Sequence, residues 1–192
     1  MVAGRYFFNH GFLFRSFLYQ NEELPLTIAV WDEGTDEIQR HLQWIRETCE
    51  SGRAVLVLDT SGAGKLTPNP LNGHDARSFY GVIHKLSDDL IWLNDSLAAM
   101  RTYDVLRAIE FSAQIPGIMA EDIRLYAHGR QGMYAQLASL LDGKIKAIDV
   151  AQGMGSMKSW IGARHYDSHD IMSIVLPGML KYFDLPDLGF KR

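Results

Sequence analysis

The chain has 192 residues, 47% of them apolar, which is enough to enclose the core of one domain, residues 1–192. Its net charge of −4 and its scattered lysines and arginines argue against nucleic acid or an anionic membrane surface as a partner. The single cysteine excludes an internal disulfide, the N-terminus lacks a signal-peptide pattern, and no run approaches the roughly 18 apolar residues of a spanning helix. We therefore expect a cytoplasmic protein.

Weak alternation of apolar and polar residues over 10–25, followed by the turn "NEELP", predicts an antiparallel strand near the N-terminus. We expect it to pair with the next strand along the chain, and we treat 1–25 as an N-terminal strand region. Runs rich in β-branched and other apolar residues predict four further strands, at 26–31, 53–58, 122–127 and 145–150. Such continuous runs are typical of parallel strands that helices cover on both faces.

Helical spacing of apolar residues predicts helices at 35–52, 95–114 and 133–144. Thr35 is the expected N-cap of the first helix, and Gly52 its end. Alternating strands and helices predict an α/β fold, a mostly parallel sheet of about five strands flanked by helices. We expect 26–151 to be the α/β core and 152–192 to be a C-terminal segment of loops and helices.

Three polar stretches could form a phosphate-binding loop, a metal site or an ion pair. "DTSGAGKL" at 59–66 follows a strand as a phosphate-binding loop does, but it lacks that motif's first glycine and its closing Ser or Thr. His165 and His169 stand four positions apart without a third ligand at a telling spacing, so we expect neither a metal nor a cofactor. Asp104 and Arg107, three apart on a predicted helix, are expected to form an ion pair.

The stretch "YAHGRQGM" at 126–133 has the pattern of a strand that turns sharply into a helix. Hydrolases carry a nucleophilic serine on such a turn, the G-x-S-x-G elbow, and the neighbouring residues must be small. Here His128 precedes the crest, Gly129 occupies it and Arg130 follows it. The sequence therefore keeps the small residues of an elbow but not its nucleophilic oxygen.

Taken in order, these motifs resemble an α/β-hydrolase of the acetyl xylan esterase-like branch, which is related to prolyl oligopeptidase and dienelactone hydrolase. "VLVLDTSGAGKL" is similar to the family's D-x-R-G-x-G turn, with Ser61 in place of the arginine. "SLAAMRTYDVLRAIEF" is similar to the helix before the nucleophile strand, and "IRLYAHGRQGMYAQLASLLDGKIKAIDV" to the elbow, its helix and the following strand. The resemblance runs over 26–188 and implies a partial α/β-hydrolase fold.

The resemblance also implies where an active site would lie. Its crest is Gly129, which cannot attack an acyl carbon, and the sequence stops before the strands that carry the family's acid and histidine. Ser61 is a weak candidate for a relocated nucleophile, with His128 as its partner. The loop "WDEGTD" matches the position of one oxyanion-hole N–H, and its acidic side chains would oppose a developing negative charge. The candidates in this loop are Asp32, Glu33 and Gly34.

We therefore predict a catalytically degenerate α/β-hydrolase-like protein that serves as a binding or assembly module, or is the remnant of an enzyme. The alternative is an active carboxylic-ester hydrolase with a relocated nucleophile or a triad completed by a partner. The expected ligand is a small molecule or a carbohydrate. We also expect a homodimer or higher oligomer, because the strand at 145–150 has few edge-guarding charges and apolar side chains of the tail are expected to be exposed. The apolar tail residues are Ile174, Leu176, Met179, Leu180, Tyr182 and Phe183.

Overall fold

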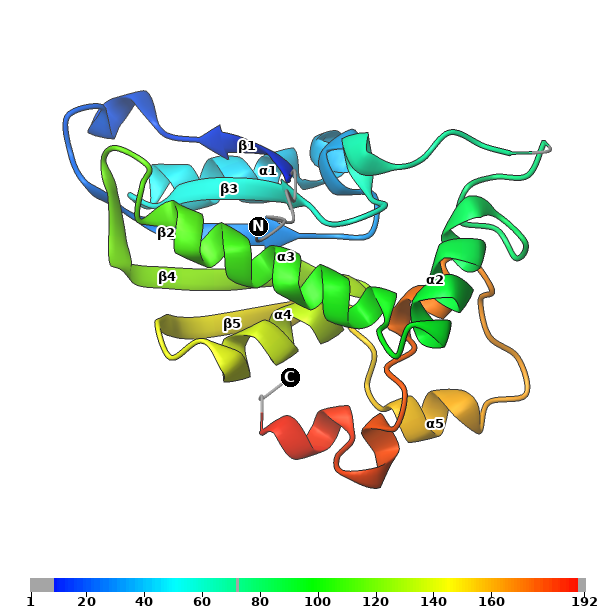
Figure 1. The fold of residues 1–192 in the computed structure, drawn as a ribbon. Helices are drawn as coiled ribbons and strands as arrows, with labels where there is room; N and C mark the ends of the chain where they lie inside the picture. The colour runs from blue at the N-terminus through cyan, green and yellow to red at the C-terminus, as the bar shows by residue number, and fades with distance from the viewer. Residues whose placement is uncertain (1–8, 72, 190–192) are drawn as a thin grey trace, which may run out of the picture.

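The computed structural model describes residues 9–71 and 73–189, and its centre is one sheet in the order β1-β3-β2-β4-β5 (Figure 1). Residues 1–8, which belong to the expected N-terminal strand region, lie outside the described residues. β2, β3, β4 and β5 run parallel, which confirms the predicted α/β fold class. The strands are β1 (His10–Phe14), β2 (Leu24–Val30), β3 (Ala54–Asp59), β4 (Ile118–His128) and β5 (Ile145–Ala151).

β1 is antiparallel, as predicted, but its predicted partner is wrong. It pairs with β3, with His10 opposite Asp59 and Phe14 opposite Val55, and not with the strand that follows it. Both edges of β2 are already occupied, one by β3 and the other by β4. The added strand therefore finds free hydrogen-bonding groups at the outer edge of β3.

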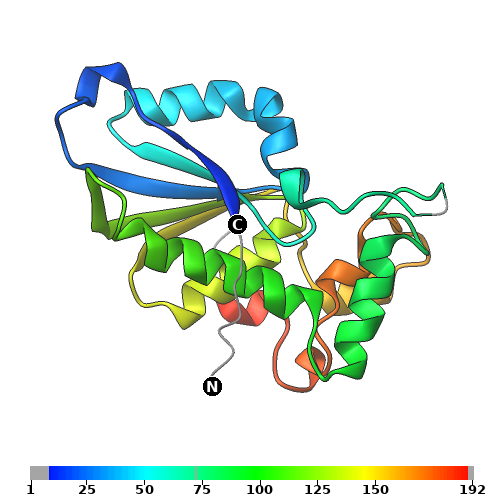
Figure 2. The ribbon, with the colours of Figure 1, turned by 45° about the horizontal axis from the view of Figure 1, so that its top comes forward.

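Helices cover both faces of the sheet, as Figure 2 shows: α1 (Ile38–Glu50) lies on one face, and α3 (Leu97–Ser112) and α4 (Gln131–Leu141) lie on the other. α2 (Val82–Trp92) has no counterpart among the predicted helices. Its only buried side chains are Ile83 and Ser87, so it has little of the apolar stripe that reveals a helix in sequence. α5 (Met157–Ile161) lies in the C-terminal segment. No described helix is long and apolar enough to cross a membrane.

The first predicted helix begins later than expected, and Thr35 is not its N-cap. Residues Gly34–Glu37 form a 3-10 turn before α1. The Thr35 hydroxyl donates instead to Oδ2 of Asp59 at 2.7 Å, and its backbone N–H donates to Oδ1 at 2.6 Å. A tertiary partner has therefore taken the side chain that the sequence pattern assigned to the helix.

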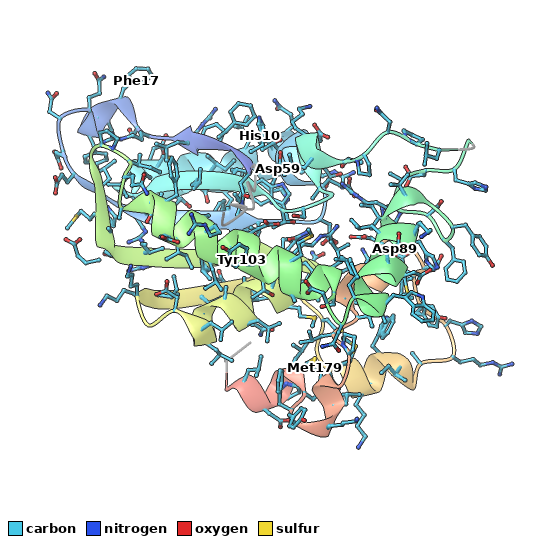
Figure 3. The ribbon with its side chains drawn as sticks, viewed as in Figure 1. His10, Phe17, Asp59, Asp89, Tyr103 and Met179 are labelled. Atoms are coloured by element: carbon cyan, nitrogen blue, oxygen red, sulfur yellow. The ribbon has the colours of Figure 1, made fainter. Side chains whose placement is uncertain are left out.

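Asp59 is fully buried at the end of β3 and joins three parts of the chain. Besides Thr35, its carboxylate accepts the backbone N–H of Lys65 at 3.1 Å and contacts Nδ1 of His10, on β1, at 2.8 Å (Figure 3). Gly34 and Gly64 lie against it with positive φ, and a Cβ at either position would overlap the carboxylate. Asp59 thus fixes the exits of β2 and β3 relative to each other.

The C-terminal segment packs onto the helices, so part of the expectation for the tail is wrong. Ile174 and Met179 are 1% and 4% exposed and lie in a core cluster with Met133 and Tyr134 of α4. Leu176 and Phe183 are partly buried against the same cluster, whereas Leu180 and Tyr182 are exposed. Tyr134 donates its hydroxyl hydrogen to the carbonyl of Ser173 at 2.9 Å, which adds a polar contact to the apolar one.

We propose that two copies associate through β5, whose outer edge has no neighbouring strand among the described residues. The free N–H and C=O groups of such an edge readily pair with another strand. Light scattering at micromolar concentration is expected to give twice the chain mass of 21.7 kDa. Ala147→Lys should favour the monomer, because Ala147 is exposed on β5 and the change adds a guarding charge beside Lys146. A mass of 21.7 kDa for the unaltered chain, unchanged by dilution, would contradict the pairing.

Candidate functional site

The turn between β4 and α4 has the elbow geometry that the sequence predicts. β4 ends at His128, Gly129 has a φ of +67°, and α4 begins at Gln131. Gly132 follows one turn later, where a Cβ would come within 2.5 Å of Val150 on β5. The positive φ and the close approach of the neighbouring strand explain why the turn is built from glycines.

The carboxylate of Asp32 lies at the crest of this turn. A Cβ on Gly129 would come within 2.5 Å of Oδ2 of Asp32. Oδ1 accepts the backbone N–H of Arg130 at 3.0 Å, and Oδ2 lies 3.4 Å from the Arg130 guanidinium. Burial raises the pKa of Asp32, and the negative charge of Asp170 adds to this, while Arg130 and the backbone N–H groups of Arg130 and Gln131 oppose it. Burial therefore favours the protonated form of Asp32, and the contacts with Arg130 and with the backbone N–H groups oppose it.

The other residues of the predicted oxyanion loop face elsewhere. Glu33 forms an ion pair with Arg77, and one of its carboxylate oxygens lies 3.7 Å from Nε2 of His169. The N–H of Gly34 donates to the carbonyl of Trp31 at 3.0 Å within the loop. Of the three candidates in this loop, it is Asp32 that lies against the turn.

A cavity of about 410 Å³ opens in front of the elbow. Arg130 forms its charged wall: its guanidinium bridges Asp32 and Asp167, with Nη2 2.7 Å from Oδ2 of Asp167. Trp160 supplies an aromatic wall and stands 5.4 Å from the ring of Tyr166. The remaining lining residues are His128, Gly129, Gln152, Gly153, Met154, Ile171 and Ile174.

Comparison with known proteins gives structural matches alone. No protein-family model matches the sequence, and no curated protein matches it significantly. A candidate acetyl xylan esterase from Bacteroides fragilis superposes with a TM-score of 0.72 at 14% identity, over 93% of this chain and 51% of its own. A candidate dienelactone hydrolase from Klebsiella pneumoniae gives a TM-score of 0.51 at 14% identity, over 84% of this chain and 60% of its own.

The chain has a partial α/β-hydrolase fold. It spans about half the length of the Bacteroides protein. A third match, 2,6-dihydroxy-pseudo-oxynicotine hydrolase, has a TM-score of 0.54 at 12% identity over 80% of this chain and 36% of its own. At these identities the likeness concerns the fold, in which the turn after the nucleophile strand is the place of the reacting serine.

In an α/β-hydrolase fold the backbone N–H that follows the crest is one donor of the oxyanion hole. Here that donor is the N–H of Arg130, and Asp32 already accepts its hydrogen. A substrate oxyanion would have to displace a carboxylate held by this N–H and by the Arg130 side chain. The crest residue Gly129 therefore presents no side-chain oxygen, and the N–H that follows it is already engaged by Asp32.

Ser61, the weak candidate for a relocated nucleophile, does not line the elbow cavity. Its N–H donates to Oδ2 of Asp104 at 2.6 Å, its hydroxyl is also bonded to Asp104, and its carbonyl accepts Nε of Arg101 at 2.8 Å. His128, its supposed partner, lies with its ring centroid 5.3 Å from that of His41 instead. The predicted ion pair of Asp104 with Arg107 is wrong, because Arg107 pairs with Glu110.

The polar stretches set aside in the sequence have structural roles. Lys65, in the stretch that follows β3, forms an ion pair with Asp36. His169 donates its backbone N–H to Asp167, and the described residues contain no group of three or more His, Cys, Asp or Glu side chains placed to hold a metal. Sequence reasoning missed the aromatic wall at Trp160 and the bridge from Arg130 to Asp167, because both depend on how the C-terminal segment folds back.

Gly129→Ala is expected to destabilise the fold by roughly 1–3 kcal/mol, through strain at positive φ and through the contact with Asp32. Asp32→Ala should relieve the contact but not the strain, so we expect a coupling of about 1 kcal/mol between the two changes. Urea unfolding of the two single variants, the double variant and the parent measures it. Gly178→Ala is the matched control, since Gly178 has a φ of +80° and open space around a Cβ. Equal costs at Gly129 and Gly178 would mean that Asp32 does not occupy the crest.

Proposed function

We propose that this chain is a catalytically silent protein of hydrolase descent, whose elbow cavity binds a carbohydrate or a similar small polar molecule without cleaving it. The observation that carries the proposal is that the crest of the turn holds the carboxylate of Asp32 and no nucleophile. Gly129 supplies no side-chain oxygen, and the Asp32 carboxylate lies where a side chain at position 129 would begin. The same carboxylate engages the N–H of Arg130, which an acyl-transfer site needs for its oxyanion.

The cavity suits a sugar because it combines an aromatic surface with hydrogen-bonding groups. A sugar ring has apolar C–H faces, which pack on an indole, and a rim of hydroxyl groups. Trp160 offers the indole, and Asp167, Gln152 and His128 offer polar side chains around it. The volume of about 410 Å³ lies in the usual range for small-molecule sites. The names of the solved structures that this fold matches include acetyl xylan esterase.

The alternative function is carboxylic-ester hydrolysis by a relocated nucleophile or by a triad that a partner completes. A relocated serine must lie within hydrogen-bond reach of a base and beside an anion-binding donor. Ser61 is bonded to Asp104 and lies outside the cavity lining. A partner could add an acid and a histidine, but the crest would still be Gly129. The contacts of the elbow therefore favour binding over hydrolysis.

The purified protein is expected to hydrolyse p-nitrophenyl acetate no faster than the same protein when unfolded, whose histidine side chains give the background rate. It is also expected to take up no fluorophosphonate label. The physical reason is the missing crest oxygen together with the engaged N–H of Arg130. Ser61→Ala should leave this background rate unchanged. Saturable turnover that ends when one serine is labelled would contradict the proposal, and loss of that turnover in Ser61→Ala would establish the alternative.

A xylo-oligosaccharide is expected to bind with saturation in a calorimetric titration. Trp160→Ala should weaken binding about tenfold, because stacking on an aromatic ring contributes roughly 1.5 kcal/mol. Trp92→Ala is the matched control: Trp92 is 89% exposed at the end of α2 and does not line the cavity. Equal loss in both variants, or no heat of binding to the unaltered chain, would count against carbohydrate binding in the cavity.

A further inference from the structure

The charges around the elbow cavity do not balance. Asp32 and Asp167 both face the guanidinium of Arg130, at 3.4 and 2.7 Å, and Arg130 is the only lysine or arginine among the lining residues. Two carboxylates against one guanidinium leave an excess of one negative charge at the cavity wall when both acids are ionised. A neutral ligand does nothing to offset this excess.

A third carboxylate, that of Asp170, lies behind the wall and is paired with a buried guanidinium. Asp170, which is 6% exposed, is near enough for its charge to act on Asp32. One of its oxygens, Oδ2, accepts Nη1 of the fully buried Arg101 at 2.8 Å. The other, Oδ1, is buried without a hydrogen-bond partner among the described residues. The Asp170–Arg101 ion pair therefore adds no net charge, and the excess at the cavity wall comes from Asp32 and Asp167.

The cavity also offers the kind of surface that stabilises a cation without a formal charge. The face of an indole attracts an ammonium group through its quadrupole, and Trp is the best of the aromatic side chains for this. Trp160 lines the cavity together with both carboxylates, so one bound ammonium group could meet an aromatic face and an acid at once. An ammonium has three donors and no acceptor, which matches carboxylate oxygens and no other charged group at this wall.

From this arrangement we propose that the elbow cavity selects a protonated primary amine on a polar ring, an amino sugar rather than a neutral sugar. The proposal rests on ligand binding at the elbow, as proposed above, and adds the chemical class of the ligand. Asp32 and Asp167 hold the ammonium, Trp160 packs against the ring, and Arg130 holds the two carboxylates in place. An anionic sugar such as a uronate is disfavoured by the same charges.

Glucosamine and glucose are the test ligands, because they differ at one position by an ammonium group in place of a hydroxyl. We expect glucosamine to bind about tenfold more tightly at low ionic strength, as charge-assisted hydrogen bonds exceed neutral ones. Asp32→Asn and Asp167→Asn should each lower this preference, the ratio of the two affinities, about threefold or more. Added salt should lower the preference in the unaltered chain, since the cavity is open to solvent.

Asp142→Asn is the matched control, because Asp142 follows the far end of α4 and does not line the cavity. Circular dichroism and unfolding curves verify that each variant keeps its fold. Equal affinity for glucosamine and glucose would overturn the amine proposal while leaving carbohydrate binding intact. A preference for glucosamine that neither Asp32→Asn nor Asp167→Asn changes would mean that the amine binds elsewhere, and it would also overturn the amine proposal. Failure of glucosamine, glucose and the xylo-oligosaccharide alike would overturn both proposals.

Discussion

One buried carboxylate determines how the loops of this protein are placed. Asp59 has no exposed surface, and an ionised carboxylate in that position must be satisfied by donors. It takes them from the N–H and hydroxyl of Thr35 after β2, from the N–H of Lys65 after β3, and from the ring of His10 on β1. Because the donors come from three segments, the carboxylate holds all three segments to the end of one strand.

The position of Asp32 follows from that constraint. Asp32 lies two residues beyond the end of β2 and three residues before Thr35, whose N–H and hydroxyl are bonded to Asp59. Trp31 closes the same short loop, with Nε1 donating to the carbonyl of Gly34 at 2.5 Å. A loop fixed at both ends leaves its middle residue little choice of direction. The Asp32 side chain meets the β4–α4 turn there, and only a glycine at position 129 leaves space for it.

The elbow and the C-terminal segment form one unit through α4. Tyr134 on this helix is fully buried and contacts Ser173, while the Nη1 of Arg101, on α3, lies 2.8 Å from Asp170 and 3.3 Å from the Tyr134 hydroxyl. Burial raises the pKa of Tyr134, so its hydroxyl stays protonated and can donate to the carbonyl of Ser173. These contacts hold residues 171–174 beside the helix, and Ile171 and Ile174 line the cavity.

The sequence by itself determined the parallel strands, the helices that cover them and the glycine turn at residue 129, since these depend on local periodicity and on backbone freedom that only certain residues have. β1 pairs with the strand whose edge stays free in the folded sheet, and no local sequence pattern predicts which strand that is. The sequence pattern predicts a helix cap at Thr35, an ion pair at Asp104 and a reactive role for Ser61. Each of these residues bonds instead to a group at least 24 residues away: Thr35 to Asp59, and Ser61 to Asp104. Asp32 and Gly129 meet across almost 100 residues of chain for the same reason. A buried charge takes whichever donors the packed fold brings to it, so only the tertiary structure decides where such side chains lie.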